Sequence, residues 1–99
     1  MNITVSGDNL NIGHNLSQFT RKRISLVFIK YSFVPVSCNI TFSKDQSRFK
    51  CYISSYFDAS VGFQSKCDDR DIYNSMKICV SKFEKQIRRF KRRLKVYKQ

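Results

Sequence analysis

Residues 71–99 read DIYNSMKICVSKFEKQIRRFKRRLKVYKQ, and this stretch decides the fold. Apolar side chains recur in it at steps of four and three residues, which places them along one side of an α-helix. Carboxylates favour the positive end of a helix dipole, so the acids at 69 and 71 mark where the helix begins. The sequence therefore predicts a long terminal helix that starts around Asp69–Asp71 and buries one apolar stripe. This stripe consists of Met76, Val80, Phe83, Ile87, Phe90 and Leu94.

The other sides of this helix are strongly basic. Between Lys82 and Lys98 there are nine Lys or Arg residues and a single acid, Glu84, so the segment carries +8 of the chain's net charge of +12. Like charges three and four residues apart on a helix repel one another, so this face loses stability unless an anion neutralises it. We interpret it as a binding surface for a polyanion. The alternative is a solvated face that only keeps the chain in solution. The candidate contacts are Lys82, Lys85, Arg88, Arg89, Arg92, Arg93 and Lys95.

A second basic cluster, Arg21, Lys22 and Arg23, lies in a stretch that has its own helical pattern. This helix is predicted from residue 13 or 14 to about residue 31. If it packs beside the terminal helix, the cluster borders a groove shared by the two helices. Alternatively, the three charges are scattered over the surface, and Arg23 extends along its apolar neighbours. The predicted buried stripe is Leu16, Phe19, Thr20, Ile24, Val27, Phe28 and Tyr31.

Four further segments show the alternation of apolar and polar residues that is typical of β-strands. One precedes the first helix and three lie between the helices, so the predicted order is β-α-β-β-β-α. Strands grouped in this way, without a strict βαβα alternation, favour an α+β fold: a four-stranded sheet with two helices packed on one face. The length predicts a single domain, residues 1–99. The predicted strands are residues 2–6, 36–43, 48–57 and 60–66, with loops at 44–47, 58–59 and 67–70.

Two groups of residues carry a resemblance to a known family. Near the start, Asn2-Ile3-Thr4 is followed by Gly7. In the last helix, Asp71-Ile72-Tyr73 comes first, with Lys82 and Gln86-Ile87 further along. In this order and at these separations, the chain resembles the short ribosome hibernation-promoting factors, also called ribosome-associated inhibitor proteins.

The resemblance implies a cytoplasmic, ribosome-associated, non-enzymatic protein. It would dock on the small ribosomal subunit, in the channel used by mRNA and tRNA, and inhibit translation. Its partners would be the RNA and proteins of that subunit, contacted through basic residues of both helices, with a separate small ribosome modulation factor acting beside it. The sequence stops at Gln99 without an acidic tail or a further domain, which predicts the short form without a tail. The alternative is a general double-stranded nucleic-acid-binding protein, because an α-β-β-β-α unit also resembles such domains.

Other functional classes fit the sequence less well. We find no combination of nucleophile, base and oxyanion donor, so we expect neither an enzyme nor a cofactor or small-molecule substrate. The four Cys residues have no CxxC spacing and lie far from the single His, so we expect no metal site. With no signal peptide and no run of about 18 apolar residues, we expect reduced thiols and no membrane span. Binding of the last helix to an anionic membrane surface is a further alternative. Asp71 is predicted to cap that helix.

Overall fold

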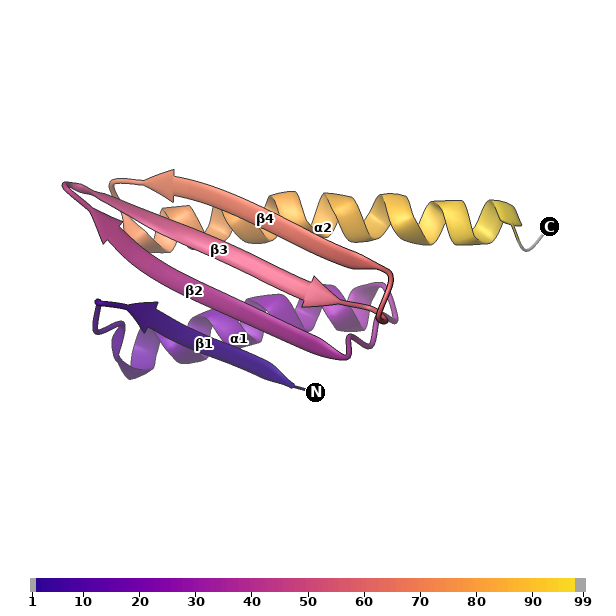
Figure 1. The fold of residues 1–99 in the computed structure, drawn as a ribbon, viewed down its shortest axis with the longest axis horizontal. Helices are drawn as coiled ribbons and strands as arrows, with labels where there is room; N and C mark the ends of the chain where they lie inside the picture. The colour runs from indigo at the N-terminus through magenta and orange to yellow at the C-terminus, as the bar shows by residue number, and fades with distance from the viewer. Residues whose placement is uncertain (1, 98–99) are drawn as a thin grey trace.

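The structure of the protein is a computed structural model that describes residues 2–97, with side chains up to residue 94. It contains two helices and four strands in the predicted order, which confirms the α+β class (Figure 1). The elements are β1 (Ile3–Asp8), α1 (Gly13–Lys30), β2 (Ser37–Asp45), β3 (Arg48–Tyr56), β4 (Gly62–Asp69) and α2 (Ile72–Tyr97).

The strands form one sheet in the order β1-β2-β3-β4. β1 is parallel to β2, and the other two pairs are antiparallel. A parallel pair needs a long crossover connection, and α1 supplies it. Both helices lie on the same side of the sheet, and the opposite side is uncovered (Figure 1). The predicted arrangement of two helices on one face is therefore confirmed.

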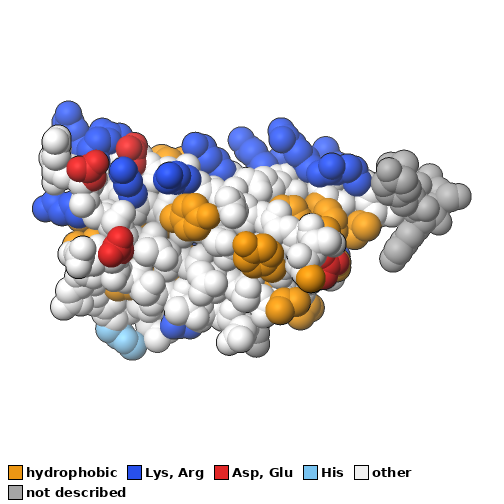
Figure 2. Space-filling view, viewed as in Figure 1, with side chains coloured by type: hydrophobic (Ala, Val, Ile, Leu, Met, Phe, Trp, Pro, Cys, Tyr) orange, Lys and Arg blue, Asp and Glu red, His pale blue; other side chains and the backbone are white. Residues whose placement is uncertain are grey.

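The core lies between the sheet and the helices. Because side chains alternate along a strand, every second residue points toward the helices. In the centre, Ile40 stands opposite Val5 on one side and Ile53 on the other. Phe83 and Ile87 of α2 belong to the same core, and both are fully buried. The outward residues of the strands are mostly uncharged and polar, so the open face of the sheet shows few charges (Figure 2).

The strand ends differ from the sequence-based prediction. β4 continues to Asp69, whereas a loop was expected from Cys67 onward. The antiparallel ladder extends because Cys67 pairs with Cys51 and Asp68 pairs with Lys50 on β3. β2 and β3 also extend to a two-residue turn, so the predicted four-residue turn is too long. Polar side chains at these strand ends pair with residues of the neighbouring strand. The local alternation of apolar and polar residues does not predict such pairs.

α2 begins as the sequence predicts. The carboxylate of Asp71 accepts a hydrogen bond from the N–H of Tyr73 at 3.0 Å, and Asp69 accepts one from the N–H of Asp71 at 2.9 Å. Asp71 therefore caps the helix by satisfying one of its free N–H groups. From this anchored start α2 crosses the sheet and extends past it at the other end (Figure 1).

Candidate nucleic-acid interface

The solvent side of α2 carries a row of exposed cations, which we call the α2 row. Its members follow one another at steps of one, three or four residues. Steps of three and four correspond to about 4.5–6 Å along a helix axis. Figure 2 shows Lys and Arg side chains along the edge of the molecule formed by β4 and α2. Lys95 belongs to the same helix, but its side chain lies outside the described part. The α2 row is Lys82, Lys85, Arg89, Arg92 and Arg93.

The single acid of α2 does not neutralise this row. Glu84 is turned toward α1, where its carboxylate accepts hydrogen bonds from the ammonium of Lys30 at 3.2 Å and the hydroxyl of Tyr31 at 3.0 Å. Burial by itself raises the pKa of Glu84, but the hydrogen bonds from Lys30 and Tyr31 outweigh it, so the pKa lies below its usual value. Glu84 is therefore ionised at neutral pH and is engaged between the two helices.

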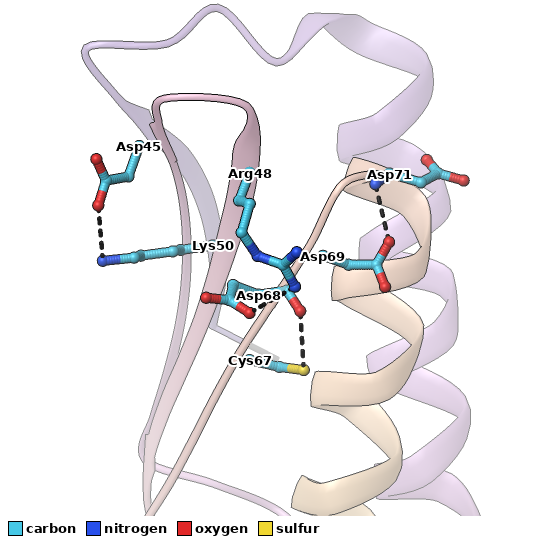
Figure 3. Close-up of polar contacts among 7 residues, drawn as sticks. All are labelled: Asp45, Arg48, Lys50, Cys67, Asp68, Asp69 and Asp71. Atoms are coloured by element: carbon cyan, nitrogen blue, oxygen red, sulfur yellow. Dashed lines mark hydrogen bonds and ion pairs between the residues drawn. The ribbon is translucent and has the colours of Figure 1, made fainter.

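The other ion pairs among the described residues lie around the β2–β3 turn (Figure 3). Arg48 contacts Asp68 at 3.1 Å, and Lys50 contacts Asp45 at 3.6 Å. Within residues 2–94, no member of the α2 row takes part in an ion pair. The row therefore presents positive charge that is available to an anion.

Arg88 differs from the other predicted contacts of α2. Its side chain is half-buried, whereas the α2 row is exposed. Its Nε atom is buried and has no hydrogen-bond partner among the described residues. It also follows Glu84 by one helical turn, and its charge contributes to the lowered pKa of that carboxyl. The structure therefore places Arg88 on the flank of α2 that faces α1, beside the row rather than in it.

The cluster predicted on the first helix is split by the structure. Arg21 is half-buried and donates a hydrogen bond to the backbone carbonyl of Ile3, on the outer edge of β1. Lys22 is exposed on the outer side of α1. Arg23 lies on the side toward α2, where it lines a shallow groove. Of the three cations expected at one shared groove, only Arg23 lines it: the guanidinium of Arg21 is occupied at the sheet edge, and Lys22 is not among the lining residues.

The groove between the helices contains charges that the sequence analysis did not single out. It has a volume of about 190 Å³, and both Arg23 and Lys30 line it. These residues are seven positions apart, or two helical turns, so the same side of α1 carries both. This spacing is visible in the sequence and would have found Lys30. The remaining lining residues are Leu26, Val27, Val80 and Glu84.

Phe19 corrects the predicted apolar stripe of α1. The sequence analysis placed it in the core, but its side chain is 39% exposed. Its ring stands on the flank toward α2, edge-on to the ring of Tyr73 at 5.7 Å. The charged groups of Arg23 and Lys77 each lie 5.9 Å from the ring centroid. Phe19 thus joins the two helices at the surface, and Lys77 is a further cation of this flank.

Other kinds of site find little support in the described residues. No group of three or more His, Cys, Asp or Glu residues among them could hold a metal ion. Nor do residues 2–97 include a helix that is long and apolar enough to cross a membrane. Cys38, Cys51 and Cys79 are buried and unbridged, and burial raises the pKa of Cys38 to about 12. The α2 row and the adjoining groove are therefore the strongest candidate site.

Comparisons with known proteins match nearly the whole chain. Residues 3–95 match the family described as sigma 54 modulation protein / S30EA ribosomal protein. The ribosome hibernation promotion factor of Bradyrhizobium diazoefficiens is 28% identical over 95 residues, covering 96% of this chain. The match covers 47% of that relative, so the chain spans about half its length.

Two solved structures share the fold. A ribosomal subunit interface protein from Coxiella burnetii superposes with a TM-score of 0.76 at 17% identity, over 92% of this chain and 98% of that one. The N-terminal domain of Protein Y from Thermus thermophilus superposes with a TM-score of 0.78 at 22% identity, over 91% and 99% of the two chains. At these identities the likeness shows the fold alone.

Proposed function

Because the chain belongs to the family of sigma 54 modulation proteins and S30EA ribosomal proteins, we propose that it is a ribosome hibernation factor. It binds the small ribosomal subunit in the channel used by mRNA and tRNA, and it inhibits translation there. It acts in the cytoplasm, without catalysis or a cofactor, and its partners are the RNA and proteins of that subunit, with a separate modulation factor beside it. The observation that carries this proposal is the α2 row, whose five cations form no ion pair with any side chain of residues 2–94.

The charge of the α2 row determines how strongly RNA binding depends on salt. If each of its five cations neutralises one phosphate, log K falls by about 3.5 to 4.5 per tenfold increase in salt. Three of the five are arginines, whose planar fork suits the oxygens of a phosphate better than a lysine does. The affinity therefore comes mostly from phosphates, and binding is strongly salt-dependent.

Specificity comes from the shape of the RNA rather than from base edges. Arg23 and Lys30 on α1 line the groove beside the row. Cations of both helices can therefore contact phosphates of the same RNA. α2 also extends beyond the sheet, which lets its far end enter a narrow channel (Figure 1). Folded RNA is recognised largely through such shape and phosphate contacts.

A matched pair of charge reversals tests the interface. Arg89→Glu/Arg92→Glu alters the α2 row, and Lys44→Glu/Arg70→Glu makes the same change in net charge at exposed positions outside α2. In sedimentation with purified small subunits at moderate salt, we expect the first variant to stay in the supernatant and the second to pellet like the wild type. If both variants pellet equally, the α2 row is not the interface.

Competition separates the hibernation proposal from general duplex binding. A protein fitted to the ribosomal channel keeps its place on the subunit in a large excess of duplex RNA, and it lowers the yield of cell-free translation. Ready displacement by duplex RNA, together with undiminished translation, would assign the chain to the general nucleic-acid binders.

A further inference from the structure

Three of the four thiols gather where β3, β4 and α2 meet. Cys51 on β3 stands directly opposite Cys67 on β4, and both point toward the helices. Cys79 on α2 packs beneath them, with its sulfur 3.3 Å from the carbonyl oxygen of Cys51. Cys38 is remote from this group, because it pairs with Ser55 at the other end of β3. None of these thiols is among the proposed RNA contacts, although Cys67 lines a cavity together with Lys82 of the α2 row.

The register places the first two thiols within bridging range. Residues directly opposite on antiparallel strands have Cα atoms about 4.5–5.5 Å apart. Disulfides are found at Cα separations of about 4.4–6.8 Å. Cys51 and Cys67 therefore meet the backbone requirement without movement of either strand. Cys38 and Cys51 do not, because the ladder separates them by four residues, roughly 13 Å along a strand.

Only Cys67 of the three is accessible. Cys51 and Cys79 are fully buried, whereas Cys67 is half-exposed and lines a cavity of about 390 Å³. Figure 3 shows its sulfur on the side toward α2, near the carbonyl oxygen of Asp68. The cavity is also lined by Lys50, Lys66 and Lys82, against one acid, Asp68. A partly exposed thiol in positive surroundings is the environment in which cysteines react.

We propose that Cys67 and Cys51 form a redox-active dithiol that is oxidised by small anionic disulfides of the glutathione type. The Cys67 thiolate attacks one sulfur of the reagent, its S–S bond breaks, and one thiolate leaves with the electron pair. Cys51 then attacks the sulfur of Cys67 in the mixed disulfide, and the second thiolate of the reagent leaves with the electron pair and takes up the proton of Cys51. In sum, the protein dithiol loses two electrons and two protons, and one disulfide molecule becomes two thiols.

The surroundings of each sulfur fix this order of events. Carboxylates of the reagent are attracted by the lysines of the cavity, which only Cys67 lines. Cys51 is fully buried, and its hydrogen bond with Cys79 together with burial raises its pKa, so it does not meet the reagent as an exposed thiolate. The entering sulfur is thus Cys67, and the resolving sulfur is Cys51.

The full-length chain treated with oxidised glutathione gives the test, read by mass spectrometry after alkylation of the free thiols. We expect the wild type to lose two free thiols with no added glutathione, and peptide mapping to join residue 51 to residue 67. Cys38→Ala and Cys79→Ala should behave in the same way. Cys67→Ser should keep its three thiols, and Cys51→Ala should retain one glutathione on Cys67.

Bridging residues 51 and 67 also closes a loop of the unfolded chain. On a chain-entropy argument, this raises the folded-to-unfolded ratio by roughly a hundredfold, a shift to higher urea that added reductant reverses. Four free thiols in the treated wild type would overturn the proposal. So would a stable glutathione adduct without a bridge, a bridge to Cys79, or a disulfide between two chains.

Discussion

The contact between Glu84 and the end of α1 makes a quantitative prediction. Its carboxylate accepts hydrogen bonds from Tyr31 and Lys30, and its side chain is 27% exposed. A hydrogen bond to a charged group contributes about 1.5–3 kcal/mol, and partial exposure reduces this because water competes for the carboxylate. We therefore expect Glu84→Ala to lower the free energy of unfolding by about 1–2 kcal/mol, and Tyr31→Phe to lower it by about 1 kcal/mol.

A double-mutant cycle isolates the interaction. Because both substitutions remove the same hydrogen bond, the loss in Glu84→Ala/Tyr31→Phe should be smaller than the sum of the two single losses by at least about 0.5 kcal/mol. Urea unfolding at neutral pH, followed by far-ultraviolet circular dichroism, supplies the three differences. Strict additivity would show that the hydroxyl of Tyr31 and the carboxylate do not interact, and the proposed link between the helices would be wrong.

The pH dependence has a definite sign. The pKa of Glu84 is lowered in the folded protein, so the unfolded chain binds a proton more readily than the folded one. The stabilisation by Glu84 is then fully present above the unfolded value of 4.5, and it is lost as the pH falls through the lower folded pKa. The difference in stability between wild type and Glu84→Gln should therefore shrink from neutral pH to about pH 3. A difference that stays constant over this range refutes the assignment.

Three further predictions concern other parts of the fold. Arg21→Ala should lower the free energy of unfolding by about 1 kcal/mol, because it frees the carbonyl of Ile3, while the salt dependence of RNA binding stays that of the wild type; a flatter salt dependence would return Arg21 to the interface. Asp71→Ala should cost about 1 kcal/mol in urea unfolding through loss of the helix cap, and Asp71→Asn should restore most of it. Added salt should raise the melting temperature of the free protein by screening the α2 row and should weaken its complex with RNA, so salt effects of the same sign in the two assays would contradict the reasoning.

The predictions for α2 succeed because two local signals coincide there. The apolar residues repeat with the helical period, and Asp71 precedes them as an N-terminal cap. Both signals are independent of tertiary contacts, and the structure confirms both. The basic charge is just as local, because the cations lie outside the apolar stripe and therefore face away from the sheet. The five exposed cations of the α2 row could therefore be predicted from the sequence, but the position of Arg88 on the flank toward α1 could not.

The residues of α1 show where such reasoning ends. Arg21 and Arg23 are two positions apart, about 200° around the helix, so they cannot share a side. Which of them meets β1 and which meets α2 depends on how the helix rests on the sheet. Phe19 was misplaced for the same reason, since a helix with neighbours on two sides has a flank that is apolar and yet exposed. Local periodicity gives the stripe of a helix but not its rotation against two partners.

The position of Glu84 connects the stability of the fold with its charge. An acid on the solvent side of α2 would neutralise part of the α2 row. On the flank, the same acid joins α2 to Lys30 and Tyr31 and leaves the row unneutralised. The mutual repulsion of the row then destabilises the free protein, and bound phosphates remove that repulsion. Anion binding and folding are therefore linked through one helix: whatever holds α2 against α1 also holds Arg23 and Lys30 in place beside the row.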